Sequence, residues 1–511
     1  MTTRPVTLED VRRCTELLES IVEDRSLLAD TPQPEKIRFL QAAGRVAIPD
    51  RTAKSRLTKA FHKNKRLGKR KRDRATLAET EIRSARREAV FTAPEEKVAS
   101  EPRPPGPKLE FPRACYICKE DFSELHFFYD AMCIPCAELN YAKRFQTAPL
   151  DGKVALVTGA RVKIGFQASL MLLRAGARVI ATTRFPHDAA ERYAREPDAA
   201  KWSHRLQVHG LDLRHAPSVE LFARHLDQTE ERLDILLNNA AQTVRRPPGF
   251  YAHLLALETR SSDELSPAAQ ALLASHGRCI EALRGSRELS GAGPASALTP
   301  NWKSADPGLG IHGSAALSQI PYGVEHETDL AKAFPERRLD ADLQQVDLRK
   351  MNSWRLTLAD VATPEMIEVH LVNAVAPFIL CSKLKPLMLR NRTGAGHIVN
   401  VSAMEGSFSR GTKTDKHPHT NMAKAALNMM TLTSAPDYAK SGIYMNAVDT
   451  GWVTDEDPSI HAERKKNELD FQPPLDIVDG AARICDPVFS SVRTGEFVWG
   501  NFFKDYGRTA W

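Results

Sequence analysis

Four cysteines have the spacing of a metal site. Cys115 and Cys118 are separated by two residues. After an interval of 14 residues, Cys133 and Cys136 repeat that spacing. Each Cys-x-x-Cys turn brings two thiolates to one side of the backbone, and two such turns complete the tetrahedron that Zn²⁺ prefers. With four thiolates present, His126 is not needed as a ligand, and the sequence predicts a closed structural Zn²⁺ site.

A second stretch could bind an anion. Asp151–Phe166 (DGKVALVTGARVKIGF) contains a short apolar run, Lys153–Val157, typical of a buried parallel strand. Gly159 and Gly165 lie in the turn that follows, and Phe166–Arg174 has the apolar spacing of a helix. A strand, a tight glycine turn and a helix N-terminus together form a site for the pyrophosphate of a dinucleotide.

The composition of the chain limits the class of protein to which these residues belong. The chain has 511 residues, 42% hydrophobic and 26% charged, which suits one large domain with additions. The sequence contains no run of about 18 apolar residues, the length that would suggest a membrane span. The N-terminus lacks the apolar core of a signal peptide. Eight cysteines are too few for a disulfide scaffold, and the grouping of four points to metal in a reducing compartment. We therefore expect a cytoplasmic protein without membrane contact.

Residues 1–92 are predicted to form a helical, basic N-terminal region. Thr7 and Asp10 have the spacing of a capping box, and a second helix is expected at Glu35–Val46. Residues 51–90 hold 15 lysines and arginines against four acidic residues, whereas the net charge of the whole chain is +7. Two interpretations are open, a solvated helix or flexible arm and a patch for nucleic acid or another polyanion.

The rest of the chain divides by composition. Residues 93–112 contain six prolines and are predicted to be an extended linker. Residues 113–146 are predicted to be a zinc-finger-like module, with a helix at Ala137–Arg144 and an aromatic core. From residue 150 to 511, strand and helix patterns alternate, which predicts an α/β fold with a doubly wound, Rossmann-type parallel sheet. Residues 243–350 are an insertion, expected to cover the crevice at the strand ends.

Several motifs occur in a fixed order within 150–511. They are TGARVKIG (158–165), Asp212-Leu213, NNAA (238–241), VNAVAPF (372–378), HIVNVSAMEG (397–406), MAKAALNMM (422–430) and MNAVDTGWV (445–453). In this combination the sequence resembles the short-chain dehydrogenase/reductase superfamily, as an atypical member with an N-terminal four-cysteine module.

The resemblance implies a set of cofactor-binding residues. Gly159 and Gly165 would let the backbone approach the pyrophosphate, and Asp212 and Leu213 would hold the adenine. The further positions implied are Arg161, Lys163, Ile164, Arg184, Asn238, Ala240, Lys424, Gly451 and Val453. Lys163 stands where the family has its middle glycine, so the turn is expected to shift while a cation there, or Arg161, offsets phosphate charge.

The residue after the second strand bears on the choice of cofactor. An acidic residue in this region would bind the ribose 2′-hydroxyl of NAD. The chain has Thr183 and Arg184 instead, and a guanidinium suits a 2′-phosphate. The expected cofactor is therefore NADP(H) rather than NAD, although Arg184 as a mere surface residue at the start of the next helix is the alternative.

The catalytic positions depart from the family pattern, which uses Asn, Ser, Tyr and Lys. Asn373 and Lys424 fit the asparagine and the lysine. Thr420 occupies the tyrosine position, and Ala403 occupies the serine position with Ser402 beside it. Because an alkyl hydroxyl is a much weaker acid than a phenol, Thr420 cannot simply replace the tyrosine as proton donor.

Three explanations for the missing phenol stay open. A donor comes from elsewhere, with His417, His419 and Tyr251 as candidates; Thr420 relays a proton through water or ribose; or the site binds nucleotide without turnover. The expected function is NADP(H)-dependent oxidoreduction of a carbonyl, alcohol or activated C=C of a small molecule. The alternative is a catalytically weak or inactive NADP(H)-binding sensor or scaffold that binds partner proteins through the zinc module and the basic arm. The oligomeric state stays open: members of the family often pair through the helices near Asn373 and Lys424, whereas the additions of this chain could obstruct such a homo-oligomer.

Overall fold

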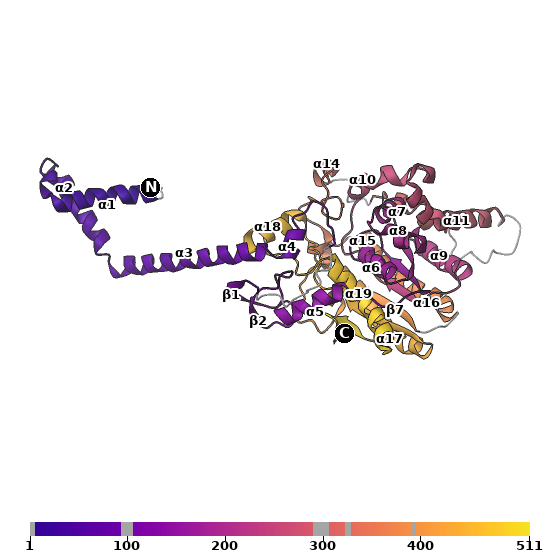
Figure 1. The fold of residues 1–511 in the computed structure, drawn as a ribbon. Coiled ribbons are helices and arrows are strands. Elements are labelled where there is room, and N and C mark those ends of the chain that lie inside the picture. Colours follow the sequence, from indigo (N-terminus) through magenta and orange to yellow (C-terminus); the bar gives the residue numbers. More distant parts are fainter. Residues whose placement is uncertain (1–5, 94–105, 290–305, 322–328, 391–394) are drawn as a thin grey trace. The chain divides into compact units, whose positions relative to one another are not determined.

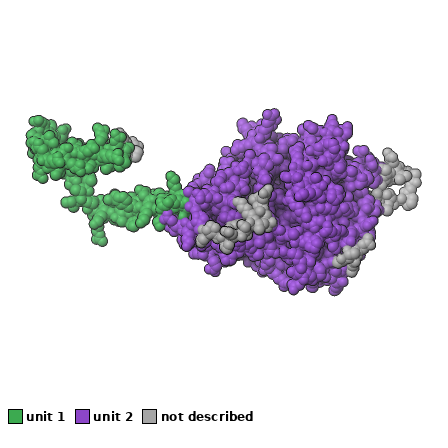
Figure 2. All heavy atoms as spheres, in the orientation of Figure 1, with its two compact units in different colours: residues 1–73 green, residues 74–511 purple. Residues whose placement is uncertain are grey.

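The computed structural model describes residues 6–93, 106–289, 306–321, 329–390 and 395–511, without the side chains of 285–289. The chain divides into two units, residues 1–73 and 74–511 (Figure 2). Part of the predicted linker, residues 94–105, lies outside the described residues.

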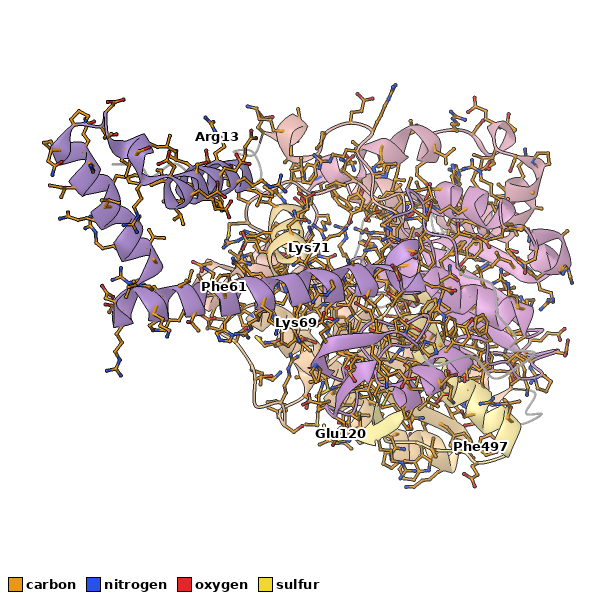
Figure 3. The ribbon with its side chains drawn as sticks, turned by 60° about the vertical axis from the view of Figure 1, so that its left-hand side comes forward. Arg13, Phe61, Lys69, Lys71, Glu120 and Phe497 are labelled. Atoms are coloured by element: carbon orange, nitrogen blue, oxygen red, sulfur yellow. The ribbon has the colours of Figure 1, made fainter. Side chains whose placement is uncertain are left out.

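The first unit is helical, as expected. Its helices are α1 (Leu8–Glu23), α2 (Gln33–Ala47) and the larger part of α3 (Arg51–Ala78). The capping box at the start of α1 is confirmed, since the Asp10 amide donates to Thr7 Oγ1 over 3.1 Å and the Thr7 amide donates to Asp10 Oδ2 over 2.9 Å. Side chains stand along α3, among them Phe61, Lys69 and Lys71 (Figure 3), and Phe61 is 65% exposed.

The second unit contains two sheets and the remaining helices (Figure 1). The strands are β1 (Lys108–Ala114), β2 (Asp121–Glu124), β3 (Val154–Thr158), β4 (Arg178–Thr183), β5 (Leu206–Gly210), β6 (Ile235–Asn238), β7 (Gly396–Ser402), β8 (Ile443–Asp449), β9 (Phe502–Lys504) and β10 (Gly507–Thr509). The helices are α4 (Glu81–Ala85), α5 (Ile134–Arg144), α6 (Lys163–Arg174), α7 (Pro186–Ala194), α8 (Ala199–Trp202), α9 (Ala216–Thr229), α10 (Pro248–Glu258), α11 (Pro267–Leu289), α12 (Leu309–His312), α13 (Ser314–Leu317), α14 (Leu330–Ala333), α15 (Thr363–His370), α16 (Ala376–Leu389), α17 (Pro418–Lys440), α18 (Ser459–Leu469) and α19 (Ile477–Thr494).

The large sheet is a doubly wound Rossmann-type sheet, as the sequence predicts. Its strand order is β10-β9-β8-β7-β6-β3-β4-β5, and all neighbours from β9 to β5 run parallel. Strands β3 and β6 are buried along their whole length because helices cover both faces of the sheet. The chain changes direction in the sheet between β3 and β6, and this is the point where such folds bind ligands.

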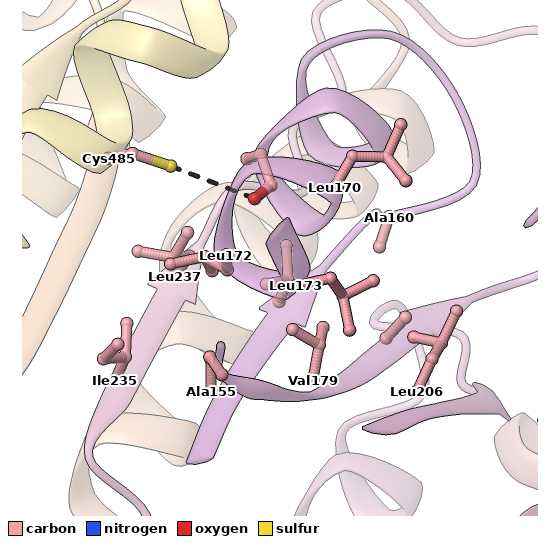
Figure 4. Packing of buried hydrophobic residues seen from close by; sticks show 14 of the residues in the cluster. Ala155, Ala160, Leu170, Leu172, Leu173, Val179, Leu206, Ile235, Leu237 and Cys485 are labelled. Atoms are coloured by element: carbon pink, nitrogen blue, oxygen red, sulfur yellow. Dashed lines mark hydrogen bonds between the residues drawn. The ribbon is translucent and has the colours of Figure 1, made fainter. Parts of the chain in front are cut away.

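Two hydrophobic clusters fix the sheet between its helices. One face carries α6, α7 and α19, and Figure 4 shows Leu170, Leu172 and Leu173 of α6 packed over strands β3, β4 and β6. The other face carries α9 and α16. Helix α11, from the insertion, contributes residues to both clusters and lies against β5, so it closes that edge of the sheet.

One helical stretch, Thr363–Leu389, has the length and hydropathy of a membrane span. It comprises α15, a π-helical turn (Leu371–Val375) and α16. Its apolar residues Leu380, Leu384 and Leu387 are buried in the cluster under the sheet. The hydropathy of this stretch is therefore that of a helix packed in a protein core.

The cysteine-containing segment docks on the Rossmann domain. Helix α5 packs on α19 (Figure 1). Arg144 of α5 is buried and bonds Asp476 Oδ1 over 2.7 Å and Asp479 Oδ1 over 2.8 Å, and the Tyr129 hydroxyl also donates to Asp479. Breaking such a buried, hydrogen-bonded charge network costs several kcal/mol, so the segment is held in a fixed place.

The C-terminal side of the predicted linker is a strand. Residues 108–112, which the proline content assigned to the linker, begin β1, paired with β2. The pairing register shifts between Lys108 and Arg113, and Pro112 lies within that irregular part. Because proline has no amide hydrogen, a strand tolerates it at such a bulge. The other domain boundaries stay a prediction.

Candidate active site

A cavity of about 1110 Å³ opens at the carboxyl ends of the parallel strands. Its walls are the turn after β3, residues after β4, β5, β6, β7 and β8, parts of the insertion, and the first cysteine turn. We call the part near β4 and β5 the β4 end and the part near β7 and β8 the β8 end. The volume is at the upper end of the range typical of small-molecule sites, so the cavity has room for a ligand as large as a dinucleotide.

The two glycines of the turn after β3 lie where close packing requires glycine. Gly159 has φ +66°, and a β-carbon there would lie 2.8 Å from Cα of Ala240. A β-carbon on Gly165 would lie 2.3 Å from the carbonyl oxygen of Gly159. At the N-terminus of α6, the N-cap residue Val162 provides no side-chain cap. The first amides of α6 are thus available to an anion in the cavity, and these residues fit a pyrophosphate.

Lys163 adopts a backbone conformation that favours glycine. Its φ is +55°, in the left-handed region, which costs strain for a residue with a β-carbon. Burial opposes ionisation of Glu456, but the charges of Lys163 and Arg246 outweigh that effect and lower the pKa of Glu456. Lys163 therefore has a carboxylate near it. Ile164 lines the cavity beside it.

The two arginines proposed for phosphate differ in their surroundings. Arg161 is buried and bonds Asp188 Oδ2 and Gln344 Oε1, each over 2.7 Å, so its guanidinium is already held by protein groups, although Arg192 shares the same carboxylate. Arg184, directly after β4, donates to the Tyr251 hydroxyl over 2.7 Å and lies 4.7 Å above that ring. Among the residues that the structure describes, Arg184 has no ion pair with a carboxylate. Its charge is therefore available to a ligand at the β4 end.

The other residues implied for the adenosine half all line the cavity except Asn238. Leu213, Ala240 and the buried Asp212 line the cavity, and the Asp212 carboxylate is bonded by Arg214. Asn238 instead donates to Asn400 Oδ1 over 2.8 Å beneath the strand ends, and its neighbour Asn239 lines the cavity. The sequence alone does not show which of the two asparagines faces the cavity, because this depends on β6 ending at Asn238.

Lys424 and Ser402 line the β8 end. Lys424 Nζ donates to the carbonyl oxygen of Val401 over 2.8 Å. Burial lowers the pKa of Lys424 to about 8, although Glu405 and Asp449 act in the opposite direction. The hydroxyl of Ser402 donates to Asn428 Oδ1 over 2.5 Å. A buried ammonium with a pKa of about 8 is still mostly charged at neutral pH.

Asn373 lies in the π-helical turn of the long helix and acts on the backbone. Its Oδ1 accepts from the Gln242 amide over 2.8 Å, and its Nδ2 donates to the Gln242 carbonyl over 2.7 Å. π-helical turns are rare and frequent at functional sites. Here the turn places the buried side-chain amide of Asn373 against the backbone of Gln242, between β6 and the insertion.

The threonine at the tyrosine position does not face the cavity. Thr420 is 1% exposed, and its hydroxyl donates to the carbonyl oxygen of Thr243 over 3.2 Å. Of the alternative donors, His419 is also buried away from the cavity, and burial lowers its pKa to about 4. Tyr251 is with Arg184 at the β4 end. His417 lines the cavity, stacked on Trp354 at 3.9 Å between ring centroids, and burial lowers its pKa.

An acidic residue that the sequence interpretation did not single out lies at the carboxyl end of β8. Asp449 lines the cavity at the β8 end, and burial raises its pKa to about 6 even though the Gly451 amide donates to it over 3.0 Å. Gly451 (φ +76°) and Val453 follow in the same wall. The sequence contains a signal for it, because Asp449 ends a buried, largely apolar strand.

Tyr116 is a second residue that was missed. It lies between Cys115 and Cys118, yet it lines the β8 end of the cavity, and its hydroxyl accepts from the Trp452 amide over 2.9 Å. No local sequence signal reveals this, since the contact depends on how α5 docks on α19.

The four cysteines converge as the spacing predicts. Their Sγ atoms all lie within 4.8 Å of one another, and those of Cys118 and Cys133 are 3.6 Å apart. In a tetrahedral zinc site with Zn–S bonds of about 2.3 Å, sulfur atoms are separated by about 3.8 Å. Burial raises the pKa of Cys115, but backbone amides that donate to its sulfur outweigh this and lower it to about 7. The donor set fits structural Zn²⁺. His126 Nδ1 accepts the Phe128 amide over 3.1 Å instead of facing the thiols.

Comparison with known proteins gives matches to both halves of the Rossmann domain. A family model described as short chain dehydrogenase matches residues 153–253, and one described as enoyl-(acyl carrier protein) reductase matches residues 343–473. An uncharacterized protein of Acanthamoeba polyphaga mimivirus is 29% identical over 403 residues, covering 77% of this chain and 74% of that protein.

Two curated relatives match shorter stretches. An uncharacterized oxidoreductase of Bacillus subtilis is 31% identical over 180 residues, which are 33% of this chain and 70% of that protein. Human retinol dehydrogenase 13 is 37% identical over 93 residues, which are 18% of this chain and 28% of that protein. Among solved structures, an NADPH-bound carbonyl reductase from chicken fatty liver aligns with a TM-score of 0.40 and 16% identity, covering 72% of this chain and 98% of that one.

Proposed function

Because the chain belongs to the short-chain dehydrogenase/reductase family of oxidoreductases, we propose that it uses NADP(H) to interconvert a carbonyl and an alcohol, or to reduce an activated C=C, of a small molecule. The observation that carries the proposal is one continuous cavity. It joins the uncapped N-terminus of α6, the available guanidinium of Arg184 and the buried ammonium of Lys424.

The order of these groups along the sheet orients the dinucleotide. The pyrophosphate binds at the N-terminus of α6, next to β3 and therefore in the middle of the sheet. Arg184 on one side suits the 2′-phosphate of the adenosine half, so the nicotinamide half extends toward Lys424 and Gly451 at the β8 end. The bound dinucleotide supplies or accepts a hydride. Lys424 holds the nicotinamide ribose by charge-assisted hydrogen bonds, and Asn373 keeps the backbone next to this site in place.

The preference for NADP(H) is tested at Arg184. In Arg184→Ala we expect the affinity for NADPH, measured by nucleotide fluorescence, to fall 10- to 100-fold, because a hydrogen bond between charged groups contributes about 1.5–3 kcal/mol. The affinity for NADH should change less than twofold. The matched control is Arg178→Ala at the amino end of the same strand, where the guanidinium is bonded to Glu230 instead. Equal loss for both nucleotides would contradict the role of Arg184.

Turnover is tested at Lys424. A panel of aldehydes, ketones and enones is screened by the change in absorbance at 340 nm, with Lys424→Ala beside the wild-type chain. We expect the wild type to reduce at least one member and the variant to lose activity at least 100-fold with little change in fold. Turnover that survives in Lys424→Ala would place the chemistry elsewhere.

A second function has an observation in its favour. Thr420 and Ala403 replace the family's tyrosine and serine, and Thr420 is turned away from the cavity. On this proposal the chain senses or scaffolds through bound NADP(H), with the zinc module and the basic arm available to partner proteins. Tight NADPH binding together with failure across the whole panel would favour it.

A further inference from the structure

The first cysteine turn reaches into the nicotinamide half of the cavity. Tyr116 Oη accepts the Trp452 amide over 2.9 Å, and a β-carbon on Gly451 would lie 3.2 Å from it. The phenol therefore stands beside the Gly451 turn, where the proposed function places the nicotinamide. Among the residues that the structure describes, no acceptor is found for the Tyr116 hydroxyl, so its proton is free to face the cavity.

Three other hydroxyls of this end already donate to protein acceptors. Ser402 donates to Asn428 Oδ1, Thr450 donates to the Gly451 carbonyl, and Thr454 donates to Glu456 Oε1. Thr420, at the family's tyrosine position, does not line the cavity and donates to the carbonyl oxygen of Thr243. A hydrogen-bond donor with no protein acceptor in a cavity of this kind is a group available to a ligand.

The position of Tyr116 is fixed from several directions. The cysteines on either side of it in the sequence, Cys115 and Cys118, belong to the cluster that fits Zn²⁺. Lys119 donates its ammonium to the Tyr116 carbonyl and lies 5.2 Å above the ring. The module as a whole is attached to α19 through the buried Arg144. A side chain supported in this way can act with the geometric precision that catalysis needs.

We propose that Tyr116 is a catalytic residue that donates a hydrogen bond to the carbonyl oxygen of the substrate. This inference rests on the proposed function. The zinc module then supplies from outside the Rossmann domain the phenol that the family carries at the position of Thr420. The substrate class is a molecule whose carbonyl reaches the β8 end between Tyr116 and Lys424.

The placement is tested in the full chain without any turnover. The nine tyrosines are replaced by 3-fluorotyrosine, and the ¹⁹F signals of Tyr116, Tyr141 and Tyr251 are assigned from three tyrosine-to-phenylalanine variants. We expect NADP⁺ to shift the signals of Tyr116 and Tyr251. ADP-ribose 2′-phosphate, which is NADP⁺ without its nicotinamide, should shift the Tyr251 signal alone. Tyr141, in the aromatic core of the same module, serves as control and should not respond. Benzamide, an amide carbonyl that is not reduced, should shift Tyr116 further in the NADP⁺ complex.

The outcomes separate the inference from the function on which it rests. A Tyr251 signal that ignores NADP⁺ overturns the proposed function and the inference with it. A Tyr251 signal that responds, beside a Tyr116 signal that responds to neither NADP⁺ nor benzamide, overturns the inference alone.

Kinetics of the variants test hydrogen-bond donation. Tyr116→Phe keeps the ring and should keep zinc content and NADPH affinity within twofold, while kcat for the carbonyl substrate found in the screen falls about 100-fold, the usual effect of losing one such donor. Tyr141→Phe should retain full kcat. A loss below threefold in Tyr116→Phe would overturn the donor role, and so would a change confined to KM.

Discussion

Lys163 holds its position in the turn at the expense of backbone strain, and this can be measured. A non-glycine residue in the left-handed region costs about 1–2 kcal/mol, so Lys163→Gly should raise the free energy of unfolding by about 1 kcal/mol relative to Lys163→Ala. Both variants remove the ammonium, and their difference therefore isolates the effect of the β-carbon at φ +55°. The measurement is urea unfolding of the nucleotide-free protein. Equal stabilities would mean that the turn relaxes to another conformation.

Asp449 should make stability depend on pH. Its pKa is raised from 3.8 to about 6 by burial, so the folded chain binds the proton more tightly than the unfolded chain. The contribution of Asp449 to the free energy of unfolding is fully present below pH 3.8 and is lost as the pH rises through about 6. A shift of about two pKa units corresponds to roughly 3 kcal/mol.

The substitution Asp449→Asn removes that penalty and keeps an acceptor for the Gly451 amide. At pH 7 we expect the free energy of unfolding to rise by up to about 3 kcal/mol, and at pH 4 to change little. Urea unfolding at the two pH values checks this. A gain of equal size at pH 4 would show that a cause other than ionisation is responsible.

At the scale of elements, the π-helical turn fixes the start of the insertion. Asn373→Ala leaves the Gln242 amide and carbonyl without their partner, which should cost about 2–3 kcal/mol in urea unfolding. Asn373→Asp keeps the acceptor but places a buried carboxylate oxygen opposite the Gln242 carbonyl, so it should destabilise the fold at least as much as Asn373→Ala. Hydrogen exchange at residues 242–251 should accelerate in both variants. Unchanged exchange there would mean that the insertion is held by other contacts.

The strands were predictable and the composite wall of the cavity was not. Short apolar runs that are buried on both sides, such as those of β3 and β4, can hardly be anything other than central strands, and the glycine turn follows from the same local pattern. Thr420 was identified as unsuitable from its chemistry alone. Tyr116 could not be found, because its contact with the Gly451 turn depends on the packing of two segments more than 300 residues apart.

At the scale of the molecule, several apolar side chains remain on the surface of the helices that carry the catalytic positions. Ile367, Val375, Phe378, Met422, Met429 and Leu432 are each 38–61% exposed. Exposed apolar residues gathered on neighbouring elements indicate an interface, and we expect a second copy of the chain there.

Sedimentation tests this pairing. The wild-type chain should be a dimer at micromolar concentration, and Phe378→Glu should shift it to monomer because a buried, unpaired carboxylate is costly. Phe408→Glu, at a side chain that is 82% exposed on another segment, is the matched control and should remain dimeric. A wild-type monomer would refute the expected interface.

The basic helix α3 leads to a prediction at the same scale. Its cationic residues 63, 65, 66 and 70 are exposed, and apolar side chains such as Phe61 are not covered either, so the helix surface of the first unit is available to a polyanion. We expect the chain to bind a 20-base-pair DNA duplex without sequence preference and with steep salt dependence. Replacing Lys63, Lys65, Arg66 and Arg70 by glutamine should lower the slope of log affinity against log salt by about 3 to 4, close to one for each phosphate that is no longer neutralised.

The matched control replaces Arg12, Arg13, Arg38 and Arg45, which are exposed on α1 and α2, and removes the same charge from the same unit. If the field of the whole unit attracts the duplex, the slope falls equally in both variants; if α3 itself binds the duplex, it falls only in the first. Electrostatic attraction between α3 and DNA is strongest at low salt, where screening is weak. If the wild-type chain does not bind the duplex even at 50 mM salt, α3 is a solvated helix without a polyanion partner.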